Sequence, residues 1–169
     1  MIKVMQNKNN ILVLGVGNIL LHDEGIGVHV VRDLEEHYSF SEQVTLLDGG
    51  TLGMRLLNAI GQADYMIVAD TLCSGKAPGT VSRLTGSELK GRVAAKNSQH
   101  QVSFLETIAY ADFLGMLPET VMIGCEPKDL SAWGTELSLE VAEARPLMLE
   151  KVLEEIRLAG GEVRPLADA

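Results

Sequence analysis

Short, continuous apolar runs alternate along this chain with longer segments whose apolar residues recur at helical spacing. A short apolar run bounded by glycine, acidic or turn-forming residues is typical of a buried strand. Such runs predict strands at 11–15, 44–47, 65–69 and 120–125. An apolar residue at every third or fourth position predicts an amphipathic helix. That spacing occurs at 25–38, 52–60, 102–114 and 137–158.

Three features modify this pattern. Pro146 falls inside the last helical segment, where a proline should kink the helix or begin a new one. The sequence Asp48-Gly49-Gly50 is expected to stop the second strand. Residues 86–99 are polar and do not match either pattern, so we leave them unassigned.

Strands that alternate with helices predict βαβ units, in which helices cover both faces of a parallel sheet. The turn-rich segment 74–79 leads into a further short strand at 80–84. Its connection from Ala69 is too short for a helical crossover, so this strand should be antiparallel and lie at an edge. We therefore predict an α/β fold: a three-layer sandwich with a mostly parallel, twisted, five-stranded sheet and one antiparallel strand. Residues 1–169 are expected to form one domain with loosely held ends at 1–10 and 161–169.

The composition is that of a globular protein, with 46% hydrophobic and 22% charged residues in a chain of 169. Its net charge of −9 disfavours binding to a phosphate backbone, so no nucleic acid is expected as a partner. No apolar run is long enough to span a bilayer, and residues 1–10 lack a secretory signal. A cytoplasmic protein is the expectation. Cys73 and Cys125 form no metal-binding pair and are interpreted as small core residues.

Candidate chemistry lies where the strand order of such a sheet reverses, beyond the carboxyl ends of the first and third strands. The loop after the first strand carries Glu24, and Asp70 follows the third strand. His100, just before the helix at 102–114, can reach the same edge. Two carboxylates and an imidazole suit a divalent transition metal. The alternatives are structural: Glu24 as a first-turn acid, Asp70 as a turn or capping residue, and His100 as a solvated loop histidine.

Two further histidines lie near the first loop. We interpret His29 as a helix-surface residue and leave His22 open.

Five motifs in order resemble one family, the nickel-iron hydrogenase maturation proteases. They are Gly15-Val16-Gly17-Asn18 through Asp23-Glu24-Gly25-Ile26-Gly27, then Asp48-Gly49-Gly50-Thr51, Ile67-Val68-Ala69-Asp70, Ala77-Pro78-Gly79-Thr80 and His100-Gln101. The resemblance covers about residues 11–158. It implies an endopeptidase that removes a short C-terminal peptide from the precursor of a hydrogenase large subunit, after nickel has been inserted.

The resemblance also implies roles for individual residues. Glu24, Asp70 and His100 would bind the metal. That metal would be nickel supplied by the precursor, although zinc or cadmium could occupy the site in vitro. The segment Asp48-Gly49-Gly50-Thr51 is linked to substrate recognition in the family, and a tight turn is the structural alternative. Asp48 is also a candidate general base. Gly15, Gly17 and Asn18 would form a structural glycine loop.

Other hydrolase routes and functions are less well supported. The chain has neither the GxSxG motif of serine hydrolases nor the HExxH motif of zinc peptidases. A dinucleotide-binding module would require a third glycine where Leu20 stands, and Glu24 would repel a pyrophosphate. A different metal-dependent hydrolase, or a chaperone that senses nickel without cutting, would share the same ligands.

Overall fold

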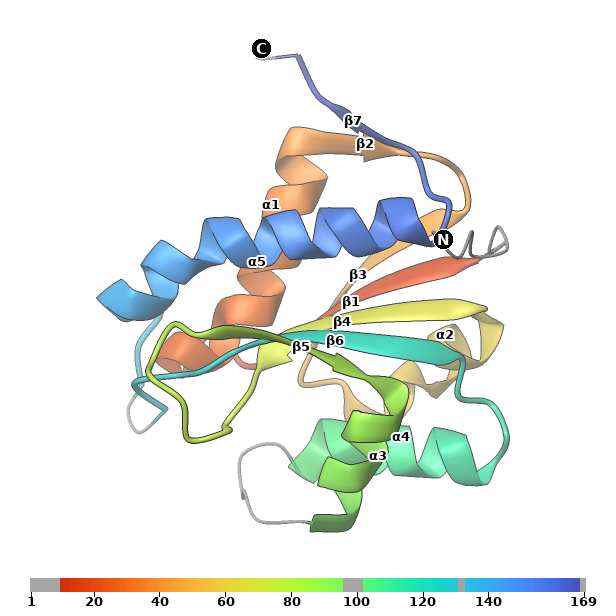
Figure 1. Cartoon of the computed structure of the whole chain (residues 1–169), viewed down its shortest axis with the longest axis horizontal. Coiled ribbons are helices and arrows are strands. Elements are labelled where there is room, and N and C mark those ends of the chain that lie inside the picture. The colour runs from red at the N-terminus through yellow and green to blue at the C-terminus, as the bar shows by residue number, and fades with distance from the viewer. Residues whose placement is uncertain (1–9, 96–101, 131–132, 168–169) are drawn as a thin grey trace, which may run out of the picture.

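The computed structural model describes residues 10–95, 102–130 and 133–167. A five-stranded sheet forms its centre, in the order β3-β1-β4-β6-β5 (Figure 1). Four of these strands are parallel, and only β5 at one edge is antiparallel to its neighbour β6. The strands are β1 (Ile11–Val16), β3 (Val44–Gly50), β4 (Tyr65–Thr71), β5 (Val81–Thr85) and β6 (Glu119–Cys125). The mostly parallel sheet and its antiparallel edge strand are as predicted.

Helices cover both faces of the sheet, which makes the three layers. Figure 1 shows α1 (Ile26–His37) and α5 (Leu139–Leu158) on one face. The other face carries α2 (Leu57–Gln62), α3 (Gly86–Ala95) and α4 (Val102–Phe113). Two 3₁₀ turns, η1 (His22–Gly25) and η2 (Gly53–Leu56), precede α1 and α2. No helix in the described parts of the chain is long and apolar enough to cross a membrane.

The central strands are apolar throughout because both of their faces are buried. In β1, Ile11 and Val13 pack in the core beneath α1 and α5. Leu12 and Leu14 point the opposite way and pack in the core that contains Ile108 of α4. A continuous apolar run was therefore the correct signal for these strands.

One sequence expectation is wrong, a segment that was left unassigned is now placed, and one of the two alternatives for Pro146 is excluded. The strand β3 continues through Asp48 to Gly50, because a bulge between Gly15 and Val16 keeps its pairing with β1. The unassigned segment begins with α3. No new helix begins at Pro146, which lies inside α5. The buried face of α5 continues on both sides of the proline, so packing offsets the lost hydrogen bond.

The described residues after Gly160 pack against the rest of the fold, whereas a loosely held end was expected. Gly161 is buried, and β7 (Val163–Pro165) pairs with β2 (Tyr38–Phe40) in a small antiparallel ribbon. The backbone N–H of Leu166 donates to the carbonyl of His37 at 2.8 Å. These contacts join residues more than 100 positions apart, so no local pattern could reveal them.

Candidate metal site

A small cavity lies beyond the carboxyl ends of β1, β3 and β4, at the predicted reversal of strand order. The loop after β1 contributes Gly17 and Glu24, and the end of β4 contributes Asp70. Gly50 and Thr51, at the end of β3, line the third side. The cavity volume is about 60 Å³. This space suits an ion with a water molecule, and it is too small for a dinucleotide.

Asp70 is buried in this cavity, with 5% of its surface exposed. Burial, assisted by the nearby charge of Glu24, raises the pKa of its carboxyl group to about 7. The N–H of Thr71 donates to Asp70 Oδ1 at 2.7 Å and partly opposes this effect. At neutral pH the Asp70 carboxyl group is therefore partly protonated and can exchange its proton for a metal cation.

Two glycines allow the Glu24 loop to lie directly against the strands. Gly17 has φ +129°, and a Cβ atom there would lie 1.7 Å from the carbonyl oxygen of Glu24. At Gly27, in the first turn of α1, a Cβ atom would lie 2.0 Å from the carbonyl oxygen of Ala69. Only glycine permits such close approach of two backbones. The first of these contacts shapes the Glu24 loop, and the second seats α1 beside the residue that precedes Asp70.

Asp23 is a site residue that the sequence did not reveal. It is fully buried, and its Oδ2 accepts hydrogen bonds from the backbone N–H groups of Lys128 and Asp129 at 2.9 and 2.8 Å. Ser138 donates its backbone N–H to Oδ1 at 2.7 Å and its hydroxyl to Oδ2 at 2.9 Å. Asp23 thus ties the turn that carries Glu24 to the segment between β6 and α5. Its partners are more than 100 residues away, so the sequence offers only a second acid beside Glu24.

The cavity combines two carboxylates from adjacent strand ends, an arrangement suited to a divalent cation. The model of the hydrogenase maturation protease family matches residues 28–155. This chain belongs to the hydrogenase maturation protease family. It is therefore an endopeptidase, a hydrolase that acts on peptide bonds.

Individual relatives agree with this assignment. The hydrogenase 2 maturation protease of Escherichia coli (strain K12) is 40% identical over 158 residues, which are 92% of this chain and 95% of that protein. The hydrogenase expression/formation protein HupD of Rhizobium leguminosarum bv. viciae is 41% identical over 152 residues, covering 89% of this chain and 75% of that protein. The solved structure of the hydrogenase maturating endopeptidase HybD from E. coli superposes with a TM-score of 0.87 at 38% identity, covering 95% of this chain and 99% of that one.

The predicted site residues of the protease are placed as follows. Glu24 and Asp70 lie together in the cavity, whereas His100 falls outside the described residues. Asp48 does not line the cavity; its carboxylate pairs with Arg32 of α1, with Nη2 and Oδ2 2.9 Å apart. In the glycine loop, Gly15 belongs to β1, and Asn18 Oδ1 accepts the N–H of Leu20 at 3.0 Å.

The two other histidines and the two cysteines lie outside the lining of the cavity. His29 is half-buried, contrary to the surface position expected, and burial together with Arg145 lowers its pKa. His22 donates from Nδ1 to the carbonyl oxygen of Glu136 at 2.8 Å. Cys125 is buried as expected, whereas Cys73 is half-buried.

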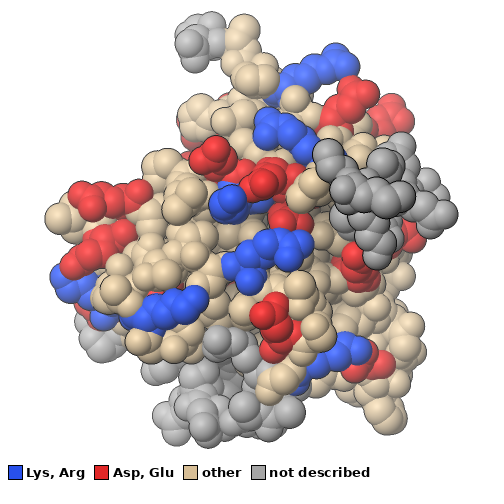
Figure 2. Space-filling view, viewed as in Figure 1, with Lys and Arg blue, Asp and Glu red and all other residues tan. Residues whose placement is uncertain are grey.

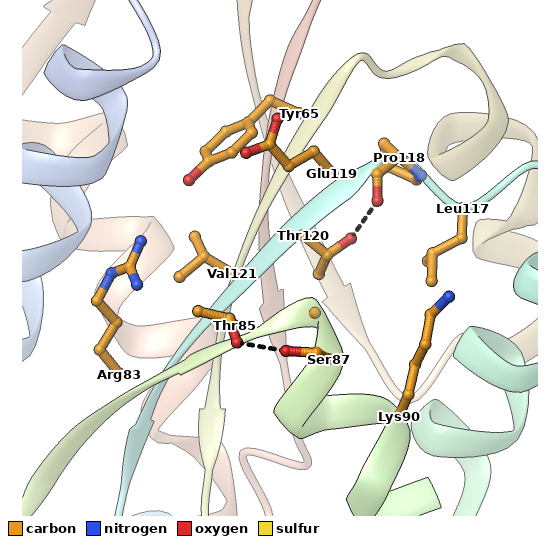
Figure 3. Close-up of a pocket in the computed structure, with 11 residues that line it drawn as sticks. Tyr65, Arg83, Thr85, Ser87, Lys90, Leu117, Pro118, Glu119, Thr120 and Val121 are labelled. Carbon is orange, nitrogen blue, oxygen red and sulfur yellow. Dashed lines mark hydrogen bonds between the residues drawn. The ribbon is translucent and has the colours of Figure 1, made fainter. Parts of the chain in front are cut away.

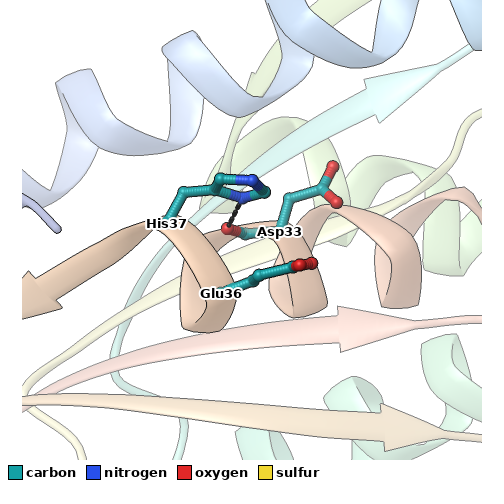
Figure 4. Close-up of side chains that lie close together, drawn as sticks. All are labelled: Asp33, Glu36 and His37. Carbon is teal, nitrogen blue, oxygen red and sulfur yellow. Dashed lines mark hydrogen bonds between the residues drawn. The ribbon is translucent and has the colours of Figure 1, made fainter. Parts of the chain in front are cut away.

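A second group of possible metal ligands lies on the outer part of α1. Asp33, Glu36 and His37 each offer an atom within 4.8 Å of the others (Figure 4). The Asp33 carboxylate already forms an ion pair with Arg145, and His37 donates from Nδ1 to the carbonyl of Asp33 at 2.9 Å. Because Glu36 and His37 are exposed and Asp33 is already neutralised, this group is a weaker candidate than the cavity at the strand ends.

A larger pocket, of about 460 Å³, lies at the opposite end of the parallel strands (Figure 3). Tyr65 and Glu119, which begin β4 and β6, line it. Its two basic residues are engaged elsewhere: Arg83 pairs with Glu155, and Lys90 pairs with Asp112 at 2.7 Å. Because it lies where β4 and β6 begin, this pocket is remote from Glu24 and Asp70 at the other end of the sheet.

Replacing Asp23 with asparagine should destabilise the protein by about 2–3 kcal/mol, because the new amide group would face at least one buried N–H donor. Urea unfolding would measure the loss. The matched control is Ser138→Ala, which removes only the hydroxyl donor and should cost about 1 kcal/mol. Equal stability of Asp23→Asn and the parent protein would contradict the anchoring role.

Proposed function

We propose that this protease removes a C-terminal peptide from the precursor of a nickel-iron hydrogenase large subunit and contacts the nickel already bound there. The names of its relatives support a substrate from hydrogenase maturation. The observation that carries the nickel contact is the pair of carboxylates, Glu24 and Asp70, in a cavity of ionic size. His100 would add the third ligand.

In this proposal the nickel is part of the substrate and identifies a precursor that is ready to be cut. A cation that enters the cavity offsets the repulsion between Glu24 and Asp70 and allows Asp70 to ionise. In a complex with nickel-free precursor, Asp70 would either stay protonated or carry a negative charge that no cation compensates. The protease would therefore bind the loaded precursor more tightly and hold its C-terminal segment nearby.

The remaining segments have narrower roles in the proposal. Gly50 and Thr51 line the cavity and would contact the precursor next to its metal. Gly49 is buried just before these two residues, at the end of β3. Asp48 would not touch the metal, and its function as general base remains a prediction.

Competing functions fit the structure less well. The glycine turn at Gly17 accommodates the carbonyl of Glu24 and so leaves no backbone cradle for a pyrophosphate. On the face shown in Figure 2, basic and acidic side chains are interspersed, without a continuous basic patch for nucleic acid.

The test compares nickel-loaded with nickel-free precursor, with cleavage followed by mass spectrometry. We expect the loaded precursor to be cut roughly tenfold faster or more, which corresponds to about 1.4 kcal/mol of differential binding. Free Zn²⁺ or Cd²⁺ should bind the protease alone and inhibit by occupying the same cavity. Equal cleavage of both precursors would refute the recognition of nickel. If neither precursor is cleaved, the proposed substrate is wrong.

A further inference from the structure

We propose that Trp133 and Leu20 form an apolar docking surface for the precursor beside the metal cavity. This inference rests on the proposed function and assigns part of its substrate contact. Trp133 is 79% exposed and Leu20 is 46% exposed. Trp133 is also the only tryptophan in the chain. Large apolar side chains exposed beside a functional site are typical of interaction surfaces, and tryptophan is enriched among the residues that dominate binding energy.

Backbone hydrogen bonds hold the two segments that carry these side chains next to each other. The N–H of Gly134, next to Trp133, donates to the carbonyl of Leu20 at 2.9 Å. The N–H of His22 donates in return to the carbonyl of Gly134 at 2.8 Å, and Leu21 pairs with Gly134 as an isolated parallel bridge. Two segments more than 100 positions apart thus lie side by side, and each carries an exposed apolar side chain.

The same contacts connect this surface to the metal cavity. Leu20 lies three residues after Gly17 and four before Glu24, both of which line the cavity. Three or four residues span at most about 15 Å, so Leu20 lies near the cavity, and the segment paired with it brings Trp133 into the same region. This nearness to the metal cavity is the main reason to assign the surface to the precursor.

The backbone beneath the surface is firmly anchored. The imidazole of His22 packs so closely on Gly134 that a Cβ atom there would lie 2.0 Å from the ring. His22 itself has φ +49°, a conformation that non-glycine residues adopt rarely unless neighbouring contacts hold it. Asp23, the residue after His22, is buried, and its carboxylate accepts the backbone N–H of Ser138. A backbone that is already fixed in this way loses little conformational entropy on binding, which favours affinity.

A second copy of this chain fits the surface less well. Each copy carries a net charge of −9, so two copies repel. Two side chains also bury far less than the roughly 1,200 Å² of a stable protein interface. The small apolar area is enough for a transient contact with an apolar part of the precursor, because the metal in the cavity would reinforce that contact.

The first test measures steady-state cleavage of nickel-loaded precursor by Trp133→Ala and Leu20→Ala variants. We expect KM to rise about tenfold for Trp133→Ala, with kcat nearly unchanged. The affinity of the free protease for Cd²⁺ should stay the same, because neither residue lines the cavity. The matched control is Phe113→Ala, which removes a side chain 83% exposed at the far end of α4 and should leave KM unchanged.

A second measurement observes docking directly. Protease labelled with 5-fluorotryptophan has one fluorine resonance, because Trp133 is the only site. Added precursor should shift or broaden that resonance. An unchanged resonance, or an unchanged KM in Trp133→Ala while the parent protein cleaves normally, would overturn the docking surface but leave the proposed function intact. A resonance that changes instead with protease concentration would assign the surface to self-association and also overturn the proposal.

Discussion

Replacing Asp70 with asparagine is expected to abolish processing of the precursor and at the same time to stabilise the folded protein at pH 8. Asparagine is nearly isosteric with the protonated carboxyl group, and its oxygen can still accept the N–H of Thr71. It cannot supply a negative charge to a metal. Loss of this ligand should lower kcat/KM for the nickel-loaded precursor by roughly a hundredfold or more, since even supporting residues of metal sites cost 10- to 100-fold.

The gain in stability follows from the raised pKa of Asp70, about 7 in the folded protein against a usual value of 3.8. Below pH 3.8 the group is protonated in both the folded and the unfolded chain. Folding then buries no charge at Asp70, and the group imposes no electrostatic cost on stability. Between pH 3.8 and 7 the unfolded chain ionises first, and stability falls as the pH rises. Above pH 7 the full cost remains, at most about 4 kcal/mol. The Asp70→Asn variant escapes this cost.

Urea unfolding at two pH values can measure the effect. The advantage of Asp70→Asn over the parent protein should be about 2–3 kcal/mol greater at pH 8 than at pH 5. Asp112→Asn is the control, because Asp112 is an exposed partner of Lys90, far less buried than Asp70. If the stability advantage of Asp70→Asn does not grow with pH, the pKa of Asp70 is not raised by burial. Normal cleavage by the variant would remove Asp70 from the site.

The fold could be predicted wherever the local pattern and the tertiary environment agree. The apolar runs of β1 and β4 were recognisable because both faces of these strands are buried. The short connection before β5 correctly predicted an antiparallel edge strand. Once the strand order was predicted, the convergence of the Glu24 and Asp70 loops followed, because parallel strands end at one edge.

The missed features depend on partners that are distant in sequence. Asp23 and Glu24 are adjacent acids, and nothing local shows that Asp23 faces the backbone of Lys128 and Asp129 while Glu24 lines the cavity. The strand β7 exists because β2 lies beside it. His29 was interpreted as exposed because its helix is amphipathic, but α5 covers that side of α1 near Arg145. Such errors arise from packing, not from secondary-structure propensity.

Replacing Gly17 with alanine should disrupt the metal site without removing any ligand. The new methyl group would lie 1.7 Å from the carbonyl oxygen of Glu24, so the backbone around Glu24 has to move. The φ of +129° is also unfavourable for alanine. Together these effects should cost roughly 3 kcal/mol or more in stability. Displacement of Glu24 should also abolish Cd²⁺ binding in calorimetry.

Gly75→Ala separates the clash from the backbone conformation. Gly75 has φ +78°, but no atom lies within 4 Å of its would-be Cβ, so alanine there adds conformational strain of about 1–2 kcal/mol and no collision. If Gly17→Ala and Gly75→Ala lose similar stability and both bind Cd²⁺ normally, close packing of the Gly17 turn does not position Glu24. If only Gly17→Ala loses the metal, this contact makes the glycine loop part of the metal site although it carries no ligand itself.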